Sequence, residues 1–191
     1  RPAICGSIPA ASGTALALDL GANLECSAEK LHQFACLGSL TCKLISNVNN
    51  PSIKLLNVGK EDVKGPHVIQ NAAELIKHDV RLNYAGFIEA DQLFFTDADV
   101  IVCDGLSGNI ALKASEGVAK IWGKFHEEQI NNNWVTKLGM HISRRSMGQL
   151  SQRLNPATYN GAYLLGLKGI AIKSHGGADS RAFYKTLNIA R

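Results

Sequence analysis

The sequence contains no run of 18 consecutive apolar residues, so we expect no membrane-spanning helix. Its first residues, Arg1 to Cys5, lack the charged and apolar regions of a signal peptide. Both absences predict a cytoplasmic protein. With 191 residues, of which 46% are hydrophobic, the chain can still bury a sizeable core. We expect residues 1–191 to form a single α/β domain or the C-terminal portion of a longer enzyme.

The cysteines lack the spacing of a metal or disulfide framework. Their number is odd, no CxxC pair occurs, and we find no histidine at metal-ligand spacing. We therefore expect reduced, buried thiols, against the alternative of a nucleophilic or metal-binding cysteine. Asp97 and Asp99 look like a metal pair, but they precede a strand and are expected in a solvated turn. Neither a metal nor a cofactor is predicted. The five are Cys5, Cys26, Cys36, Cys42 and Cys103.

Acidic residues are absent between Gln129 and Ala178. Residues 1–128 carry 11 Lys/Arg and 15 Asp/Glu, whereas residues 129–191 carry 9 Lys/Arg and only Asp179. A field of one sign attracts acidic partners such as an acidic protein, a nucleic acid or an anionic membrane. The alternative is a solvated basic face that has no partner.

Short apolar runs alternate with amphipathic segments, which predicts an α/β fold in three layers around a largely parallel sheet. Val100 to Cys103 is a continuous β-branched run of the kind found in a strand covered on both faces. The two longest helices, joined by an Asn-rich turn, predict a protruding helical hairpin over residues 110–154. Expected strands include residues 15–18, 53–56, 100–103 and 170–172, and expected helices are residues 27–45, 66–77, 110–129, 134–154 and one from about 179.

Four loops that contain glycine and small polar residues each follow an expected strand and precede a helix. They are Asp19–Asn23, Asn57–Gly65, Asp104–Asn109 and Ser174–Gly177. In a parallel sheet these loops meet at one edge and direct helix N-termini into one crevice, which predicts an anion site. The alternative for any one loop is that its glycines only form turns or helix caps. No loop matches GxxxxGK[ST] or GxGxxG, which disfavours a P-loop nucleotidase and a dinucleotide site.

Within these loops we expect Lys113, Asn109 and His175 to be the catalytic contacts. Both Lys64 and Lys113 could equally be solvated lysines, and His175 could merely hold its loop. Ser107 lies outside a nucleophile elbow because Gly108 follows it directly. The expected phosphate and substrate contacts are Asp19, Asn23, Asn57, Gly59, Glu61, Lys64, Asp104, Gly105, Ser107 and Gly108.

Several strings occur in an order that resembles one family, the phosphate acyltransferases known as PlsX. They are LDLGAN from Leu18, LLNVGxExxKG from Leu55, DVIVCDGxxGN from Asp99 with Lys113 and Glu116-Gly117, LLGLKG from Leu164, and Ser174-His175-Gly176. Departures are Lys60 where an acid is common, and Ala90 and Asn160 where glycine is usual.

The resemblance implies formation of an acyl phosphate from an acyl-(acyl carrier protein) and inorganic phosphate in phosphatidic acid synthesis. It also implies a fold related to phosphotransacetylases and isocitrate or isopropylmalate dehydrogenases, a homodimer, and peripheral contact with the membrane. The family's N-terminal strand and glycine-rich region have no counterpart here. The alternative is therefore a truncated, non-catalytic module that binds acyl carrier protein or membrane.

The expected helix Trp134–Leu154 has an apolar stripe and a basic face. A helix that projects from an α/β core needs a cover for its stripe, and a second copy of the chain would supply one. The alternative is that the helix packs back onto its own sheet. The basic face would attract an anionic bilayer or carrier protein, with no role in nucleic-acid binding. This face contains Lys137, Arg144, Arg145 and Arg153.

Overall fold

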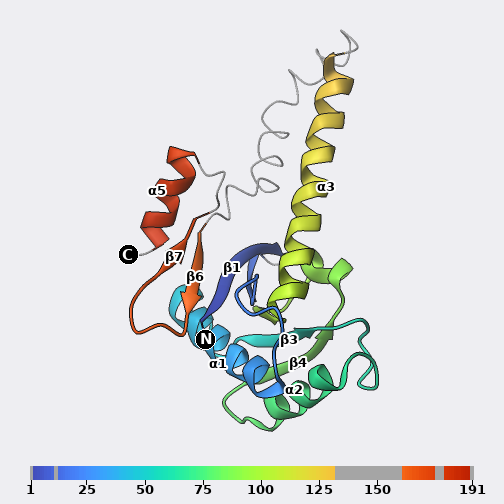
Figure 1. Ribbon diagram of the computed structural model, residues 1–191, viewed down its shortest axis with the longest axis vertical. Helices are drawn as coiled ribbons and strands as arrows, with labels where there is room; N and C mark the ends of the chain where they lie inside the picture. Colours follow the sequence, from blue (N-terminus) through green and yellow to red (C-terminus); the bar gives the residue numbers. More distant parts are fainter. Residues whose placement is uncertain (1, 11–12, 132–160, 175–178, 190–191) are drawn as a thin grey trace.

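The computed structural model describes residues 2–10, 13–131, 161–174 and 179–189 (Figure 1). Its centre is a seven-stranded sheet with the order β4-β3-β5-β2-β1-β6-β7. The strands are β1 (Ala3–Ala10), β2 (Gly13–Leu18), β3 (Ser52–Leu56), β4 (Asn83–Ile88), β5 (Val100–Val102), β6 (Ala162–Leu165) and β7 (Ile172–Lys173).

The sheet is mixed rather than largely parallel. Strands β4, β3, β5 and β2 are parallel to one another, as predicted. In contrast, β1 pairs antiparallel with β2 and β6, and β6 pairs antiparallel with β7. Because β1 and β2 form a hairpin in which Ala10 lies opposite Gly13, the direction of the chain must reverse there. Strand β1 was absent from the prediction, since Pro9 and two small residues interrupt its hydrophobic pattern.

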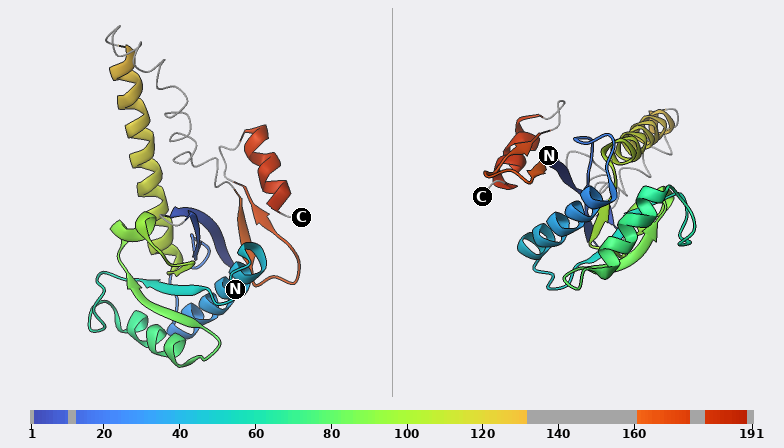
Figure 2. Two further views of the ribbon diagram at one scale, coloured as in Figure 1. Left: turned by 180° about the vertical axis from the view of Figure 1, so that it is seen from behind. Right: turned by 60° about the horizontal axis from the view of Figure 1, so that its bottom comes forward.

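One face of the sheet is covered by α1 (Ala28–Ser46) and α2 (His67–His78) (Figure 2). The predicted cap of α1 is confirmed, because the Ser27 hydroxyl accepts a hydrogen bond from the Lys30 amide. Its predicted buried stripe is confirmed at Leu31, Phe34, Ala35 and Gly38, but Ile45 is exposed at the end of the helix. A Cβ atom on Gly38 would lie 2.6 Å from Val100, so glycine lets α1 approach the sheet closely.

The opposite face is covered by the short helix η1 (Ala90–Phe95) and the first turns of α3 (Gly105–Asn131). Successive residues of a strand point to opposite faces. Accordingly Ala17 and Ile101 pack with Leu93 of η1 and Ala111 of α3, whereas their neighbours in the strands belong to the cluster beneath α1 and α2. This arrangement gives helical elements on both faces of the sheet.

Helix α3 begins five residues before the predicted start at Ile110, so the prediction of a loop over Asp104–Asn109 is wrong. The reason is a cap: the Asp104 carboxylate accepts hydrogen bonds from the Ser107 amide and hydroxyl, both at 2.8 Å. The helix extends well beyond the sheet (Figure 1). The second helix of the predicted hairpin, residues 134–154, lies outside the described residues.

The last described helix is α5 (Ser180–Ile189). Among the described residues, no helix combines the length and apolar character needed to cross a bilayer.

Candidate functional site

Three of the four segments predicted as loops meet at one edge of the sheet, although the third of them, Asp104–Asn109, is the start of α3. Strands β2, β3 and β5 are parallel and end at Leu18, Leu56 and Val102, so the segments that follow them share that edge. The fourth prediction is wrong: β7 runs in the opposite direction to β2, and Ser174 therefore follows it at the other edge of the sheet. His175 itself lies outside the described residues.

Asp19 is the fully buried centre of the first loop. One carboxylate oxygen accepts hydrogen bonds from the backbone amides of Ile4, Gly21 and Ala22 at 2.9–3.2 Å. The other oxygen accepts from the Asn23 amide at 2.7 Å and from the Asn23 side chain at 2.8 Å. With five donors, this carboxylate holds the loop in place. The Asp19 carboxylate thus stabilises the loop, and the Asn23 side chain donates both to that carboxylate and to the Pro2 carbonyl.

The start of α3 is docked against this same loop. The Gly105 amide donates to the Asn23 carbonyl at 2.7 Å, and a Cβ atom on Gly105 would lie 2.6 Å from that oxygen. A Cβ atom on Gly108 would overlap the Asp19 carbonyl oxygen. Gly21 has a φ of +127° and lies beneath the Asn109 side chain. The glycines therefore serve close packing between backbone segments.

The N-terminus of α3 is not the open anion cradle predicted from the sequence. The amides of Gly105 and Ser107 donate to Asn23 and Asp104, and the Gly108 amide donates to the Asp104 carbonyl. A carboxylate thus occupies the position where an anion would bind. Asp104, Ser107 and Gly108 form the helix start, and the groups of α3 that remain available lie farther along it.

Asn109 and Lys113 lie one turn apart on α3, and both are exposed. Among the described residues, the Asn109 side chain makes no hydrogen bond, so its amide can donate to a ligand above Gly21. The Lys113 ammonium forms an ion pair with Glu116 at 2.9 Å. These two residues present the donors that an oxyanion or a phosphate requires.

The second loop, residues 57–65, is closed by its own hydrogen bonds. The Asn57 side chain donates to the Lys64 carbonyl at 3.0 Å, and Gly65, with a φ of +87°, lies so close to the Asn57 side chain that a Cβ atom would overlap it. The side chains of Lys64 and Glu61 fold over Gly59 and form an ion pair at 2.8 Å. This hydrogen bond lowers the pKa of Glu61 and raises that of Lys64, so both stay charged at neutral pH.

The N-terminus of α2 follows this loop directly. Its N-cap, Pro66, makes no side-chain cap hydrogen bond. Lys64 precedes it by two residues, so cationic charge and backbone amides lie near each other at this edge of the sheet.

The thiols at this edge are protonated. Burial raises the pKa of Cys103, whose thiol donates to the Asp19 carbonyl at 3.3 Å, and burial also raises the pKa of Cys26. The prediction of reduced, buried thiols is confirmed at Cys5, Cys42 and Cys103, whereas Cys26 and Cys36 are half-buried. A thiolate is the nucleophilic form of cysteine, so neither Cys26 nor Cys103 is arranged as a nucleophile.

A small apolar cavity lies immediately below the edge, between η1, the sheet and α3. Its volume is about 20 Å³, and its walls include Leu20, Leu56, Cys103, Gly108 and Leu112. Such a volume admits a group the size of one water molecule. A larger apolar ligand would have to lie outside it, along exposed side chains such as Leu106 and Ile110 of α3.

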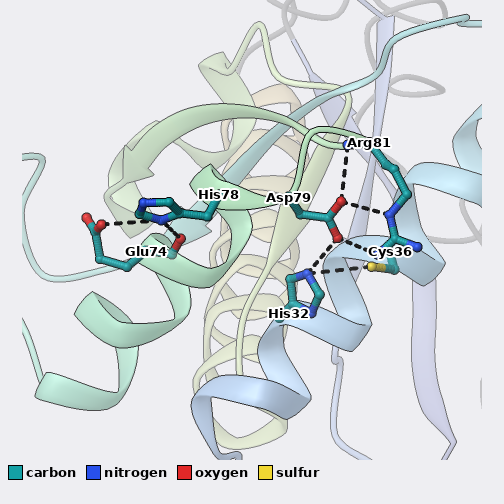
Figure 3. A network of polar contacts seen from close by, with 6 residues as sticks. All are labelled: His32, Cys36, Glu74, His78, Asp79 and Arg81. Carbon is teal, nitrogen blue, oxygen red and sulfur yellow. Dashed lines mark hydrogen bonds and ion pairs between the residues drawn. The ribbon is translucent and has the colours of Figure 1, made fainter.

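Two other features bear on the sequence predictions. Asp97 and Asp99 each bind a different residue of the chain. The Asp97 carboxylate forms an ion pair with Lys54, and the Asp99 carboxylate accepts hydrogen bonds from the amide and hydroxyl of Ser52. In contrast, His32, Cys36 and Asp79 form a cluster that the sequence analysis missed (Figure 3). The spacing of His32 and Cys36, one helical turn apart, was the available signal.

Comparison with known proteins identifies the family. A family model described as "Fatty acid synthesis protein" matches residues 1–191. The chain belongs to that family. Curated relatives include a phosphate acyltransferase of Halorhodospira halophila, 42% identical over 190 residues, and one of Alkalilimnicola ehrlichii, 45% identical over 190 residues. Each comparison covers 100% of this chain and 55% of the relative, so the chain spans about half the length of these relatives.

Among solved structures, a phosphotransacetylase from Streptococcus pyogenes gives a TM-score of 0.48 at 18% identity. The match covers 63% of this chain and 42% of that one.

Proposed function

We propose that the protein containing this chain forms an acyl phosphate from an acyl-(acyl carrier protein) and inorganic phosphate, within phospholipid synthesis. The observation that carries the proposal is the identity of 42–45%, over the whole chain, to proteins named phosphate acyltransferase. The edge of the sheet supports it, because the exposed side chains of Lys64, Asn109 and Lys113 offer cationic and amide donors after two of its strands, and burial raises the pKa of the neighbouring Cys103 thiol.

The reaction needs little proton chemistry. A phosphate oxygen attacks the thioester carbonyl carbon, a carbon–oxygen bond forms, and the carbon–sulfur bond breaks with its electron pair on the leaving thiolate. That thiolate leaves readily because the pKa of a thiol is about 8.5. Rate enhancement then depends on holding phosphate near the carbonyl and on donors for the tetrahedral oxyanion.

The described side chains suggest a division of these tasks. Lys64 and Lys113 attract the phosphate, each exchanging its present carboxylate partner for the substrate. The Asn109 amide lies above Gly21 and donates to phosphate or oxyanion. Asp19 and Asp104 act as positioning residues, since their carboxylates are engaged with backbone amides.

Lys113→Ala tests the assignment. Loss of a charge-assisted hydrogen bond is worth about 1.5–3 kcal/mol, so kcat/KM for acyl phosphate formation should fall about 10- to 150-fold in the full-length protein. The rate is measured as the phosphate-dependent formation of acyl hydroxamate with hydroxylamine as the trap, after subtraction of the hydroxamate that the thioester gives without phosphate. Lys120→Ala, an exposed lysine two turns farther along α3, serves as the matched control and should keep wild-type activity.

Two results would count against the proposal. Equal rates for Lys113→Ala and Lys120→Ala would remove Lys113 from the site. Absence of phosphate-dependent hydroxamate from the wild-type protein would remove the activity and favour a non-catalytic module that binds acyl carrier protein.

We further propose a homodimer and a cytoplasmic location with peripheral membrane contact. The predicted basic contacts for the carrier protein and the bilayer, Lys137, Arg144, Arg145 and Arg153, lie outside the described residues, so these roles rest on the sequence.

A further inference from the structure

Three metal-ligating side chains lie together between α1 and the turn that follows α2 (Figure 3). His32 and Cys36 are one turn apart on α1, and Asp79 comes directly after the end of α2. The His32 Nε2 atom lies 2.9 Å from an Asp79 carboxylate oxygen and 3.9 Å from the Cys36 Sγ atom. We propose that His32, Cys36 and Asp79 form a binding site for Zn²⁺.

The ligand set suits this ion. Zinc accepts thiolate, imidazole and carboxylate ligands in tetrahedral geometry, with bonds of about 2.0–2.3 Å. Such bonds place neighbouring ligand atoms about 3.3–3.7 Å apart. The three candidate atoms all lie within 4.8 Å of one another, so small side-chain rotations would complete the site. Three protein ligands leave a fourth position for water.

Arg81 holds the carboxylate in place from the opposite side. The Arg81 backbone amide and Nε both donate to one oxygen of Asp79, at 3.1 and 2.8 Å. The other oxygen accepts from the Arg81 guanidinium at 2.6 Å and lies against His32. Metal binding would use this second oxygen, while the first keeps its two hydrogen bonds. Residues that orient a metal-binding carboxylate in this way commonly strengthen the site.

Charge and access also permit binding. The Asp79 carboxylate and the Cys36 thiolate supply two negative charges, against one positive charge on Arg81. The side chains of His32 and Asp79 keep 24% and 10% of their surface exposed, so an ion can enter from solvent. On binding, the Cys36 thiol loses its proton to solvent and His32 presents the Nε2 lone pair, its ring proton moving to Nδ1. At least one proton is therefore released per ion.

The cluster is separate from the edge proposed to bind phosphate. In the part of the chain that the structure describes, none of the hydrogen bonds of His32, Cys36 or Asp79 involves a residue of the three loops at that edge. Metal binding can therefore be measured without reference to catalysis, and its failure would leave the proposed function untouched.

The test is a titration of the reduced, metal-free, full-length protein with Co²⁺, a spectroscopic substitute for Zn²⁺. We expect one equivalent to produce a thiolate-to-cobalt charge-transfer band in the near ultraviolet and intense visible bands typical of tetrahedral cobalt. Zn²⁺ should then displace the cobalt and abolish both. Absence of the near-ultraviolet band at stoichiometric Co²⁺ would overturn the proposal.

Variants assign the ligands. Cys36→Ser should abolish the near-ultraviolet band, and His32→Gln should weaken Co²⁺ binding at least about tenfold. The matched controls are Cys26→Ser and His78→Gln. The first removes another half-buried thiol, and the second removes an exposed histidine that is hydrogen-bonded to the Glu74 carbonyl. Both controls should bind cobalt as the wild type does. A band that survives in Cys36→Ser, or is lost in Cys26→Ser, would place the metal elsewhere.

Circular dichroism establishes that each variant is folded. If Cys36→Ser does not fold, His32→Gln decides the matter, because unchanged cobalt affinity in that variant would refute the site.

Discussion

Single acidic residues at the candidate site stabilise the backbone instead of facing a ligand. Asp19 accepts five hydrogen bonds while fully buried, and Asp104 caps the helix that follows it. Both residues lie at the predicted edge, but their partners are amides that no spacing in the sequence reveals. The exposed polar side chains of this edge are those of Asn109 and of Lys64 and Lys113, each of which forms an ion pair with a glutamate. The residues that stabilise the backbone at this edge and those proposed to contact substrate are therefore different sets.

Asp19→Asn should destabilise the protein. The substitution replaces one acceptor oxygen of Asp19 by an NH₂ group. In either orientation of the amide, this NH₂ group faces at least two N–H donors, so at least two hydrogen bonds to the carboxylate are lost. Each is worth about 1.5–3 kcal/mol, and we expect the free energy of unfolding in urea to fall by at least about 3 kcal/mol. Asp97→Asn, which breaks an exposed ion pair with Lys54, should leave the free energy of unfolding nearly unchanged, because solvent screens such a pair. An Asp19→Asn protein of wild-type stability that lacks activity would instead assign Asp19 to the substrate.

The sequence predicted which segments lie at the candidate site, but not which contacts their side chains make. Glycine and asparagine after apolar strands placed Asp19, Asn57 and Gly108 correctly at one edge. His32 and Cys36 escaped notice because their third partner, Asp79, is 43 residues beyond Cys36 in the chain. Only the packing of α1 against α2 brings Asp79 to them.

Among the elements, α3 depends most on small residues in its first turns. Gly105 and Gly108 let its backbone lie directly on the Asp19–Asn23 loop, so the helix and the loop form one unit. The sequence predicted the helix but not its start, because glycine and serine favour a loop in isolation and the Asp104 cap overrides that preference. Strand β1 was missed for a related reason: hydrogen bonds to β2 and β6, rather than residue preference, hold it in the sheet.

Two glycines of α3 should respond to alanine with opposite signs. In Gly108→Ala, the new methyl group would overlap the Asp19 carbonyl oxygen, and such overpacking costs about 1–3 kcal/mol. In Gly117→Ala, nothing lies within 4 Å of the new Cβ atom, and the helix should gain about 0.5–1 kcal/mol. Urea unfolding of the two variants measures both changes. Destabilisation by both substitutions would mean that loss of glycine alone, and not the contact with Asp19, is responsible.

At the scale of the whole molecule, the pairing of the sheet changes from parallel to antiparallel at β2. On one side lie parallel strands whose ends carry the candidate site, and on the other lie three antiparallel strands. The alternation of apolar runs and helices predicted the first half, since parallel strands need helical crossovers. The second half follows from a hairpin and from the long-range pairing of β1 with β6, which hydrophobic periodicity does not reveal.

The outer part of α3 carries large apolar side chains on its exposed surface. Ile121, Trp122 and Phe125 are 50%, 63% and 55% exposed in the described chain, and apolar groups this close together favour association with a partner. The proposed homodimer would bury them.

Trp122→Glu should then raise the dissociation constant of the dimer at least about 30-fold, because a buried tryptophan at an interface is commonly worth 2 kcal/mol or more. Sedimentation equilibrium of the full-length protein measures the change. The control Leu44→Glu, at an 83% exposed position of α1, should leave the dimer intact. If Leu44→Glu weakens the dimer and Trp122→Glu does not, the interface is formed by α1 and not by α3.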